Sequence, residues 1–220
     1  MQRITIAEEL KARVPGIRLL CIESDVVTRD SAGELLTLLD EKCHGLRSFL
    51  RTEEISSLPA IAASRKAYKL TGKDPARYRL SAEALLRRVV RGEELYHISN
   101  VVDLLNLVSI TSGFSIGGYD AGKIDGEVEM GIGRSGEPYQ AIGRGDFNID
   151  GLPVFRDLCG AFGSPTSDSE RTSVTPETRR FLMVIIDFGG SEALEEAGRL
   201  ACGLLRQFAE AASVETKIIE

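Results

Sequence analysis

The sequence predicts an α+β fold with helices in its first half, short strands in its second half and one long helix near its end. Three observations support this. Apolar residues recur at helical spacing up to residue 112, glycines and β-prone runs alternate over 113–161, and an amphipathic stretch follows the apolar run FLMVIID. With 220 residues, 43% of them hydrophobic, the chain can bury a substantial core. We expect a single domain over 1–220, without internal repeats, made of an N-terminal α/β portion (1–58), a central region (59–190) and a closing helix with a tail (191–220).

The first half is expected to hold one strand and four helices. In order, these are a strand at 17–28 and helices at 31–56, 59–71, 81–91 and 100–112. Pro59 suits the first turn of its helix, and Gly72 and Gly92 are suited to end the helices that precede them. Ser81 is expected to be an N-cap, and Asp-Pro at 74–75 places 73–80 in a loop.

The second half of the chain contains more glycines and more short β-prone runs than the first half. The runs SIGGY, EVEM, PYQAIG and LPVF alternate with turns over 113–161, which predicts a meander of short strands. Residues 163–178 form a polar stretch that is long for a connection inside a compact domain, so we expect it to have a purpose. The run 181–187 predicts a buried strand, and 191–212 predicts the closing helix.

Composition excludes several classes of protein. No stretch approaches the roughly 18 apolar residues that a membrane span needs, and charged residues at 8, 9 and 11 argue against a signal peptide, so we expect a cytoplasmic protein without membrane contact. The cysteines at 21, 43, 159 and 202 never form C-x-x-C and are expected to be buried, reduced thiols. Only His44 and His97 are present, which excludes a His-rich metal site and leaves a carboxylate site for Mg²⁺ open. We expect no cofactor.

Charge is distributed unevenly along the chain. The whole chain carries a net charge of −6, which counts against a nucleic-acid partner. Residues 65–91, here called the basic segment, contain nine Lys or Arg and two acidic residues, so this segment carries +7 and the remainder −13. A basic band on an acidic body suits a directed contact with a polyanion, although a solvated helix face explains the same charges.

Three glycine motifs resemble catalytic or phosphate-binding motifs but lack the context these need. Gly113-Phe-Ser-Ile-Gly117 matches the G-x-S-x-G elbow, but a helix precedes it and no histidine follows it. Gly131-Ile-Gly-Arg-Ser-Gly136 matches the dinucleotide fingerprint, but Glu-Pro follows where a helix should begin. Thr-Gly-Lys at 71–73 lacks the upstream glycine of a phosphate loop. We interpret all three as coincidences.

A few polar residues remain as candidates for a site. His97 is either a packing or surface residue or the near-neutral base of a reaction. Asp103 and Asn106 share one helix face, where they either form local hydrogen bonds or line a pocket. Asp120 and Asp125 flank a turn and are either turn formers or ligands.

The central segments resemble a known family. They are SAEALLRR (81–88), NVVDLLN (100–106), SGFSIGGYD (112–120), KIDG (123–126) and GEPY (136–139), in this order. They resemble the central tRNA-binding and editing domain of the bacterial phenylalanyl-tRNA synthetase β chain, and more closely the stand-alone proteins that carry this domain. The resemblance covers roughly 60–190, and the remainder is too short for a synthetase core, so the protein is not a tRNA ligase.

The resemblance implies a three-layer mixed β/β/α sandwich with a pocket that hydrolyses a mis-attached amino acid. Asn106 would shape the pocket floor, and Gly117 and Gly118 would let the aminoacyl ester approach the backbone. His97 would position a water. The amino acid itself would be held by Asp120, Glu127 and Glu137, the family's substrate-reading glutamate falling on one of the last two.

The implied function is trans-editing of mischarged aminoacyl-tRNA with a positioned water and no protein nucleophile. The acceptor arm would lie on phosphate-binding side chains of the basic segment, namely Arg65, Lys69, Lys73, Arg77, Arg79, Arg87, Arg88 and Arg91. In the family a Gly-Gln-Pro-type run follows the helix, whereas this chain has Gly113-Phe-Ser-Ile, so the amino acid read need not be tyrosine. Two alternatives stay open: a non-catalytic RNA-binding module and an amino-acid-binding protein on the same scaffold.

Overall fold

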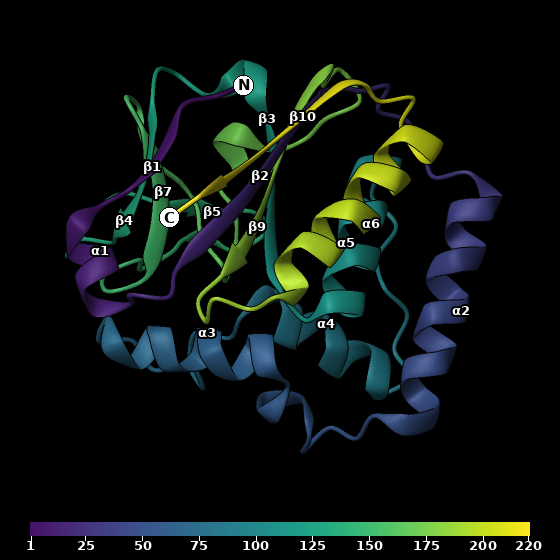
Figure 1. Cartoon of the computed structure of the whole chain (residues 1–220), viewed down its shortest axis with the longest axis horizontal. Helices are drawn as coiled ribbons and strands as arrows, with labels where there is room; N and C mark the ends of the chain where they lie inside the picture. Colours follow the sequence, from purple (N-terminus) through teal and green to yellow (C-terminus); the bar gives the residue numbers. More distant parts are fainter.

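Two four-stranded sheets and a layer of helices make up the fold in the computed structural model, which describes residues 1–220 (Figure 1). The first sheet has the order β1 (Ile4–Ile6), β4 (Val128–Ile132), β7 (Pro153–Asp157) and β8 (Gly160–Gly163). The second sheet has the order β10 (Ala212–Ile219), β2 (Arg18–Asp25), β9 (Arg180–Asp187) and β3 (Ser115–Asp120). A small hairpin pairs β5 (Gln140–Ala141) with β6 (Gly145–Asp146).

The second sheet is the middle layer, because alternate residues of its strands belong to two different cores. On β9, Phe181, Met183 and Ile185 pack in the larger core with the helices, whereas the residues between them pack in the smaller core against the first sheet. This alternation follows from the two-residue period of a strand. The predicted α+β class and β/β/α layering are therefore confirmed.

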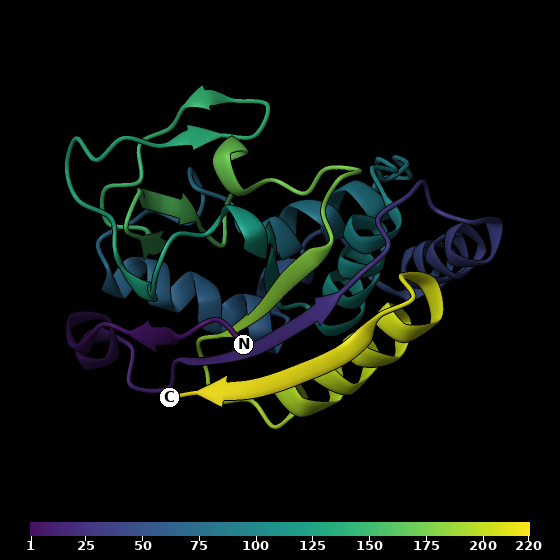
Figure 2. The same cartoon turned by 90° about the horizontal axis from the view of Figure 1, so that it is seen from above.

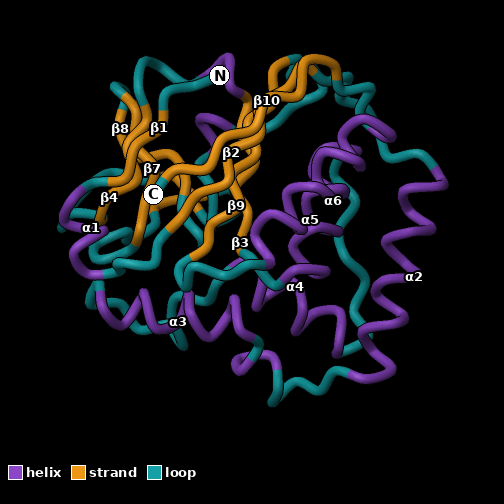
Figure 3. Tube along the Cα trace, viewed as in Figure 1, coloured by secondary structure: helices purple, strands orange, loops and turns teal.

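Six helices complete the fold. They are α1 (Glu8–Arg13), α2 (Gly33–Phe49), α3 (Pro59–Leu70), α4 (Ser81–Val90), α5 (Asn100–Ser112) and α6 (Ala193–Phe208). The last two pack against each other and cover the second sheet, with α4 beside β3, while α2 packs on α4 and α5. In Figure 3, α2, α4, α5 and α6 lie on one side of the strands, and α1 lies beside β4. Short 3₁₀ turns lie at Ile55–Ser57, Ala121–Lys123 and Glu170–Thr172. The helix α3 runs below the sheets in Figure 1 and contributes Ala67 to the smaller core.

Helix boundaries follow most of the local signals in the sequence. Pro59 is the first residue of α3, and Gly72, Gly92 and Gly113 follow their helices with φ of +90°, +79° and +78°. The expected cap at Ser81 is wrong by one residue, because Ser81 is the first helical residue and Leu80 is the N-cap. On α4, Leu86 and Val89 are buried and Leu85 is half-buried.

Three expectations about the elements are wrong. The helix expected over 31–56 ends at Phe49, where Leu50 turns to an extended conformation. The closing helix ends at Phe208 rather than Ala212, and the tail forms β10, because Glu210 and Ser213 have φ of 50° and 52°, which no helix continues. Of the cysteines, Cys159 is exposed and only the other three are buried.

The polar stretch 163–178 is a packed loop. Ser164, Thr166 and Thr178 are buried, and their hydroxyls make hydrogen bonds to Ser167 O, Tyr68 Oη and Asp120 Oδ2, all at 2.8 Å. This stretch therefore has at least a structural role. Its hydroxyl groups form hydrogen bonds in place of backbone pairing and hold the loop over the edge of the sheets.

Candidate functional site

The two glycines expected to face a substrate face protein side chains instead. A Cβ on Gly117 would lie 2.0 Å from Tyr119 Oη, and a Cβ on Gly118 would lie 2.6 Å from Leu105 Cδ1. Both positions therefore require glycine for packing on β3. The space that a Cβ at either position would need is taken by these two side chains, and the backbone of Gly118 is half-buried.

The side chain that fills the space between the sheets is Tyr119. Its ring lies edge-on to Phe162 at 5.0 Å between centroids, and its hydroxyl donates to Asp168 Oδ1 at 3.0 Å. Burial raises the pKa of Asp168 to about 7, although the Tyr119 hydroxyl and two backbone amides favour the charged form. No local pattern predicts this pair, because Tyr119 and Asp168 lie 49 positions apart in the sequence.

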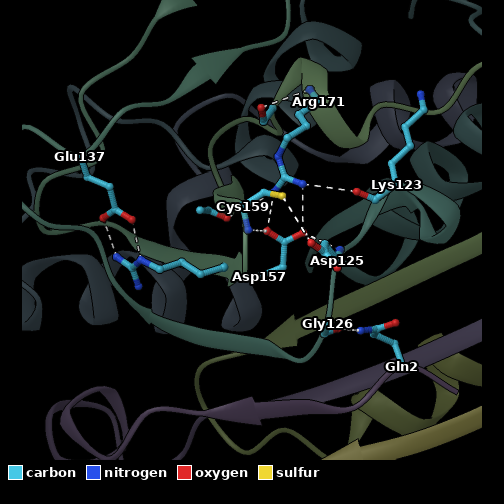
Figure 4. A network of polar contacts seen from close by, with 11 residues as sticks. Gln2, Lys123, Asp125, Gly126, Glu137, Asp157, Cys159 and Arg171 are labelled. Carbon is cyan, nitrogen blue, oxygen red and sulfur yellow. Dashed lines mark hydrogen bonds and ion pairs between the residues drawn. The ribbon is translucent and has the colours of Figure 1, made fainter.

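The three acidic candidates do not converge on one pocket. Asp120 accepts hydrogen bonds from Gly122 N at 3.0 Å and Thr178 Oγ1 at 2.8 Å, and exposed Glu127 pairs with Arg3 at 2.6 Å. Glu137 is held by the Arg156 guanidinium at 2.6 Å, in a separate place from the Asp157–Arg171 pair (Figure 4). Burial would raise the pKa of Glu137, but hydrogen bonds from Arg156 and from the Arg134 amide lower it below its usual value.

A polar cavity lies at the N-terminal end of α5. It has a volume of about 430 Å³ and is lined by Thr28, Arg29, Asp30, Ile98, Ser99, Val174, Thr175 and Pro176. Ser99 is 8% exposed and its buried hydroxyl has no hydrogen-bond partner. Thr28 donates to Thr178 O at 2.9 Å, and Thr178 in turn donates to Asp120, so one of the candidate carboxylates stands directly behind the cavity wall.

His97 and Asn106 are also near this end of α5. His97 Nδ1 lies 3.6 Å from Asp103 Oδ2, and the Asp103 carboxylate, which is fully buried, also accepts from Ser31 Oγ at 2.6 Å and Ile98 N at 3.1 Å. Asn106 is half-buried and lies two turns beyond Ser99 on the same face of the helix. The structure thus places Asp120 behind the cavity wall and His97 beside Asp103, while Asn106 makes no hydrogen bond to either of them, and Glu127 and Glu137 pair elsewhere with Arg3 and Arg156.

Several cations of the basic segment are engaged within the protein. Arg65 and Arg87 both pair with Glu83, which is buried, and Lys73 is buried with its ammonium on Asp150 O. Arg88 pairs with Glu93 at 3.0 Å. The charges of Arg65, Lys73 and Arg87, three of the residues expected to bind phosphate, are thus engaged in contacts within the protein. The exposed cations of the segment without an ion pair are Lys66, Lys69, Arg77, Arg79 and Arg91.

An exposed aromatic residue connects the basic segment to the cavity. The Arg88 guanidinium lies over the Tyr96 ring, 4.3 Å from its centroid, and also donates to Glu94 O. Tyr96 is 69% exposed and Ile98, at the cavity, is 62% exposed. The chain therefore runs from the end of α4 past Tyr96 and His97 into the cavity wall at Ile98 and Ser99.

Other chemistries find no support among the side chains. Ser115, the central residue of the elbow-like motif, is 1% exposed, and its hydroxyl accepts a hydrogen bond from Ala82 N at 3.5 Å. No three His, Cys, Asp or Glu side chains are grouped so as to hold a metal ion. None of the helices has the length and hydrophobicity that crossing a bilayer would require.

Comparisons with known proteins place the chain in a family. Residues 63–202 match the family model of the B3/4 domain. Among solved structures, an N-terminal fragment of the phenylalanyl-tRNA synthetase β-subunit from Pyrococcus horikoshii is similar, with 14% identity, a TM-score of 0.49 and coverage of 99% of this chain. This chain spans 50% of that fragment, and no curated protein matches. The chain belongs to the B3/4 domain family, the domain type of the phenylalanyl-tRNA synthetase β-subunit.

Proposed function

We propose that this protein binds the acceptor end of an aminoacylated tRNA and hydrolyses the ester of a mischarged amino acid. The observation that carries the proposal is the exposed ring of Tyr96, which lies under the Arg88 guanidinium and precedes the cavity-lining residues Ile98 and Ser99 in the chain. Membership of the B3/4 family makes a tRNA the first polyanion to test.

The exposed cations supply the contact with the RNA backbone. Lys66, Lys69, Arg77, Arg79 and Arg91 extend from α3 through the following loop to the end of α4. Side chains of this kind bind phosphates and position an RNA without reading its sequence. The negative remainder of the chain repels RNA elsewhere, so binding is directed to this surface.

Tyr96 supplies a stacking surface for the terminal base of the acceptor end. Its ring is mostly exposed on one side and supported by Arg88 on the other. Aromatic side chains of this kind bind unpaired bases by stacking, with additional support from an arginine. A base stacked there would place the aminoacyl ester towards Ser99.

The cavity supplies the groups that an ester hydrolysis needs. The unpartnered Ser99 hydroxyl and the hydroxyls of Thr28 and Thr175 are suited to orient a water or the ester carbonyl. The water oxygen attacks the carbonyl carbon and His97 accepts the water proton; His97 then gives this proton to the ribose oxygen, which leaves as a hydroxyl when the ester bond breaks. Asp103, beside His97 Nδ1, would hold the imidazole with its other nitrogen free to accept that proton.

The test is hydrolysis of a panel of mischarged tRNAs under single-turnover conditions. We expect release of at least one amino acid, and a rate about 10-fold to 100-fold lower for Ser99→Ala with tRNA affinity unchanged. Ser112→Ala, which removes a hydroxyl from the other end of α5, is the matched control and should keep the wild-type rate. Absence of turnover on every tRNA in the panel would remove the hydrolase part of the proposal.

A non-catalytic tRNA-binding module is the second candidate, favoured by the filled space beside Gly117 and Gly118. It requires the same exposed cations but no chemistry in the cavity. Binding of tRNA without hydrolysis selects this candidate. Binding of a free amino acid without any binding of tRNA selects the third, an amino-acid-binding protein.

A further inference from the structure

The strand β10 presents a free edge. It pairs with β2 on one side only and forms the border of the second sheet (Figure 2). Glu215, Thr216 and Lys217 in its middle are all exposed. An edge of this kind presents unpaired backbone N–H and C=O groups and is a ready template for another strand.

The two faces of β10 differ in character. Thr216 and Ile218 pair with Ile22 and Leu20 of the larger core, so they and Val214 face the helical layer. A groove of about 600 Å³ lies between α6 and β10; its apolar lining is Leu20, Cys202, Val214 and Ile218, and charged side chains at its border are Glu195, Arg199, Arg206 and Lys217. On the opposite face, Glu215 and Lys217 lie beside Glu23 and Cys21. The edge thus has an apolar face and a charged face.

We propose that the edge of β10 pairs with β10 of a second copy of this chain, antiparallel and with its two-fold axis at Thr216. Residues directly opposite each other in an antiparallel pair point to the same face of the sheet. A two-fold axis perpendicular to the sheet therefore lies midway between the two copies of one residue. Centred on Thr216, the pairing places Glu215 opposite Lys217 of the partner subunit, twice. It also places Val214 opposite Ile218 of the partner subunit, at the rim of the groove.

Charge complementarity selects this register over its neighbours. An axis at Glu215 would oppose two glutamates, and an axis at Lys217 would oppose two lysines, both of which are unfavourable. Lys217 has no ion pair within its own chain, whereas Glu215 contacts the N-terminal ammonium at 3.0 Å and is still 60% exposed. The ladder with β2 is regular from Glu215 to Ile219, and a bulge lies before it, so the new pairing is short.

The first test is the molecular mass of the intact chain by light scattering and sedimentation over a range of concentrations. We expect a dimer for the wild type and a dissociation constant at least about 10-fold higher for Glu215→Lys and for Lys217→Glu, since each creates two like-charge pairs. The double variant Glu215→Lys plus Lys217→Glu reverses both charges and should restore the dimer. A monomeric wild type, or failure of the double variant to dimerise while folded, would overturn the proposal.

The second test fixes the register. In a Cys159→Ser background, which removes the exposed thiol, Thr216→Cys should form a disulfide-linked dimer on mild oxidation, because residues directly opposite have Cα atoms about 4.5–5.5 Å apart, within the range that a disulfide spans. Ser213→Cys is the matched control: it faces Ile219 of the partner subunit and should not cross-link. Equal cross-linking of both variants would contradict a pairing centred on Thr216.

Discussion

The Nε atom of Arg87 lies 3.0 Å from a carboxylate oxygen of Glu83, whose side chain is only 2% exposed. The other oxygen of Glu83 lies 2.8 Å from Arg65 on α3, so this buried α4 carboxylate joins the two helices through Arg65 and also pairs with Arg87 one turn along α4. Two of the charges that make the segment basic in sequence are thus engaged with Glu83 inside the protein. The phosphate-binding capacity of the surface rests on the remaining exposed cations.

Replacement of Glu83 by Gln is expected to affect stability and RNA binding in opposite directions. Loss of the buried carboxylate leaves Arg65 and Arg87 without a counter-charge and should lower the free energy of unfolding by about 1.5–3 kcal/mol. The same loss leaves both cations free for phosphate, so tRNA affinity should rise. Urea unfolding followed by circular dichroism and a tRNA titration measure the two effects. Glu93→Gln, which breaks the more exposed pair with Arg88, should change stability by less than about 0.5 kcal/mol.

Removal of exposed cations is expected to weaken tRNA binding uniformly across tRNA species. For Lys66→Ala, Lys69→Ala and Arg77→Ala combined, the slope of log Kd against log salt should fall by about 3, one for each lost phosphate contact. Filter binding at several salt concentrations gives the slope. Arg199→Ala with Arg206→Ala on α6 removes cations outside the basic segment and serves as the control. An equal fall in the salt slope for this α6 variant would show that tRNA binding is not directed to the basic segment.

Replacement of Tyr96 by Ala is expected to weaken binding of a tRNA with an intact single-stranded end by about 1–3 kcal/mol, the cost of losing one stacked base. Tyr96→Phe keeps the ring and should bind as the wild type does. Neither change should alter thermal stability, because the side chain is mostly exposed. A tRNA shortened at its 3′ end lacks the base that would stack, so it should bind the wild type and Tyr96→Ala with equal affinity.

Gly117→Ala tests the packing role of this glycine. The new methyl group would overlap Tyr119 between the sheets, so we expect a loss of about 1–3 kcal/mol in the free energy of unfolding. Gly203→Ala on α6 is the matched control, since nothing lies within 4 Å of its added Cβ, and it should be neutral or stabilising by up to about 1 kcal/mol. A stable Gly117→Ala protein with altered hydrolysis would instead favour a role in substrate approach.

Asp168→Asn is expected to remove part of the pH dependence of stability. The folded state raises the pKa of Asp168 to about 7, and the unfolded chain titrates near its usual value of about 4. Between these values the folded state binds more protons, so stability falls as pH rises and levels off above about pH 7. Urea unfolding from pH 4 to 8 should show this fall for the wild type and for Asp150→Asn, an exposed control, and a flatter profile for Asp168→Asn.

Much of the fold could be predicted because its signals are local. Helical periodicity, Pro59 and the glycines that follow α3, α4 and α5 mark the helices, and the apolar run of β9 marks the strand buried on both faces. The strand β10 could not be predicted. Its exposed residues carry no apolar run, and it is a strand because β2 offers it an edge.

The candidate site was harder to predict, since each of its features depends on contacts between distant residues. A count of charges cannot show that Glu83 neutralises Arg65 and Arg87, and the pair Gly-Gly at 117–118 does not show that Tyr119 and Leu105 fill the adjacent space. The family resemblance identified the region of His97, Asn106 and Asp120. The hydroxyls of Thr28, Ser99 and Thr175 stayed unnoticed because they come from three separate segments.

Binding of tRNA by the wild-type protein tests the central claim most directly. An end-labelled tRNA titrated by fluorescence anisotropy at about 50 to 200 mM salt should bind with a log–log salt slope of about 3 to 5, as expected for the five exposed cations of the basic segment. Absence of binding at about 50 mM salt, or an affinity that does not change with salt, would contradict the account.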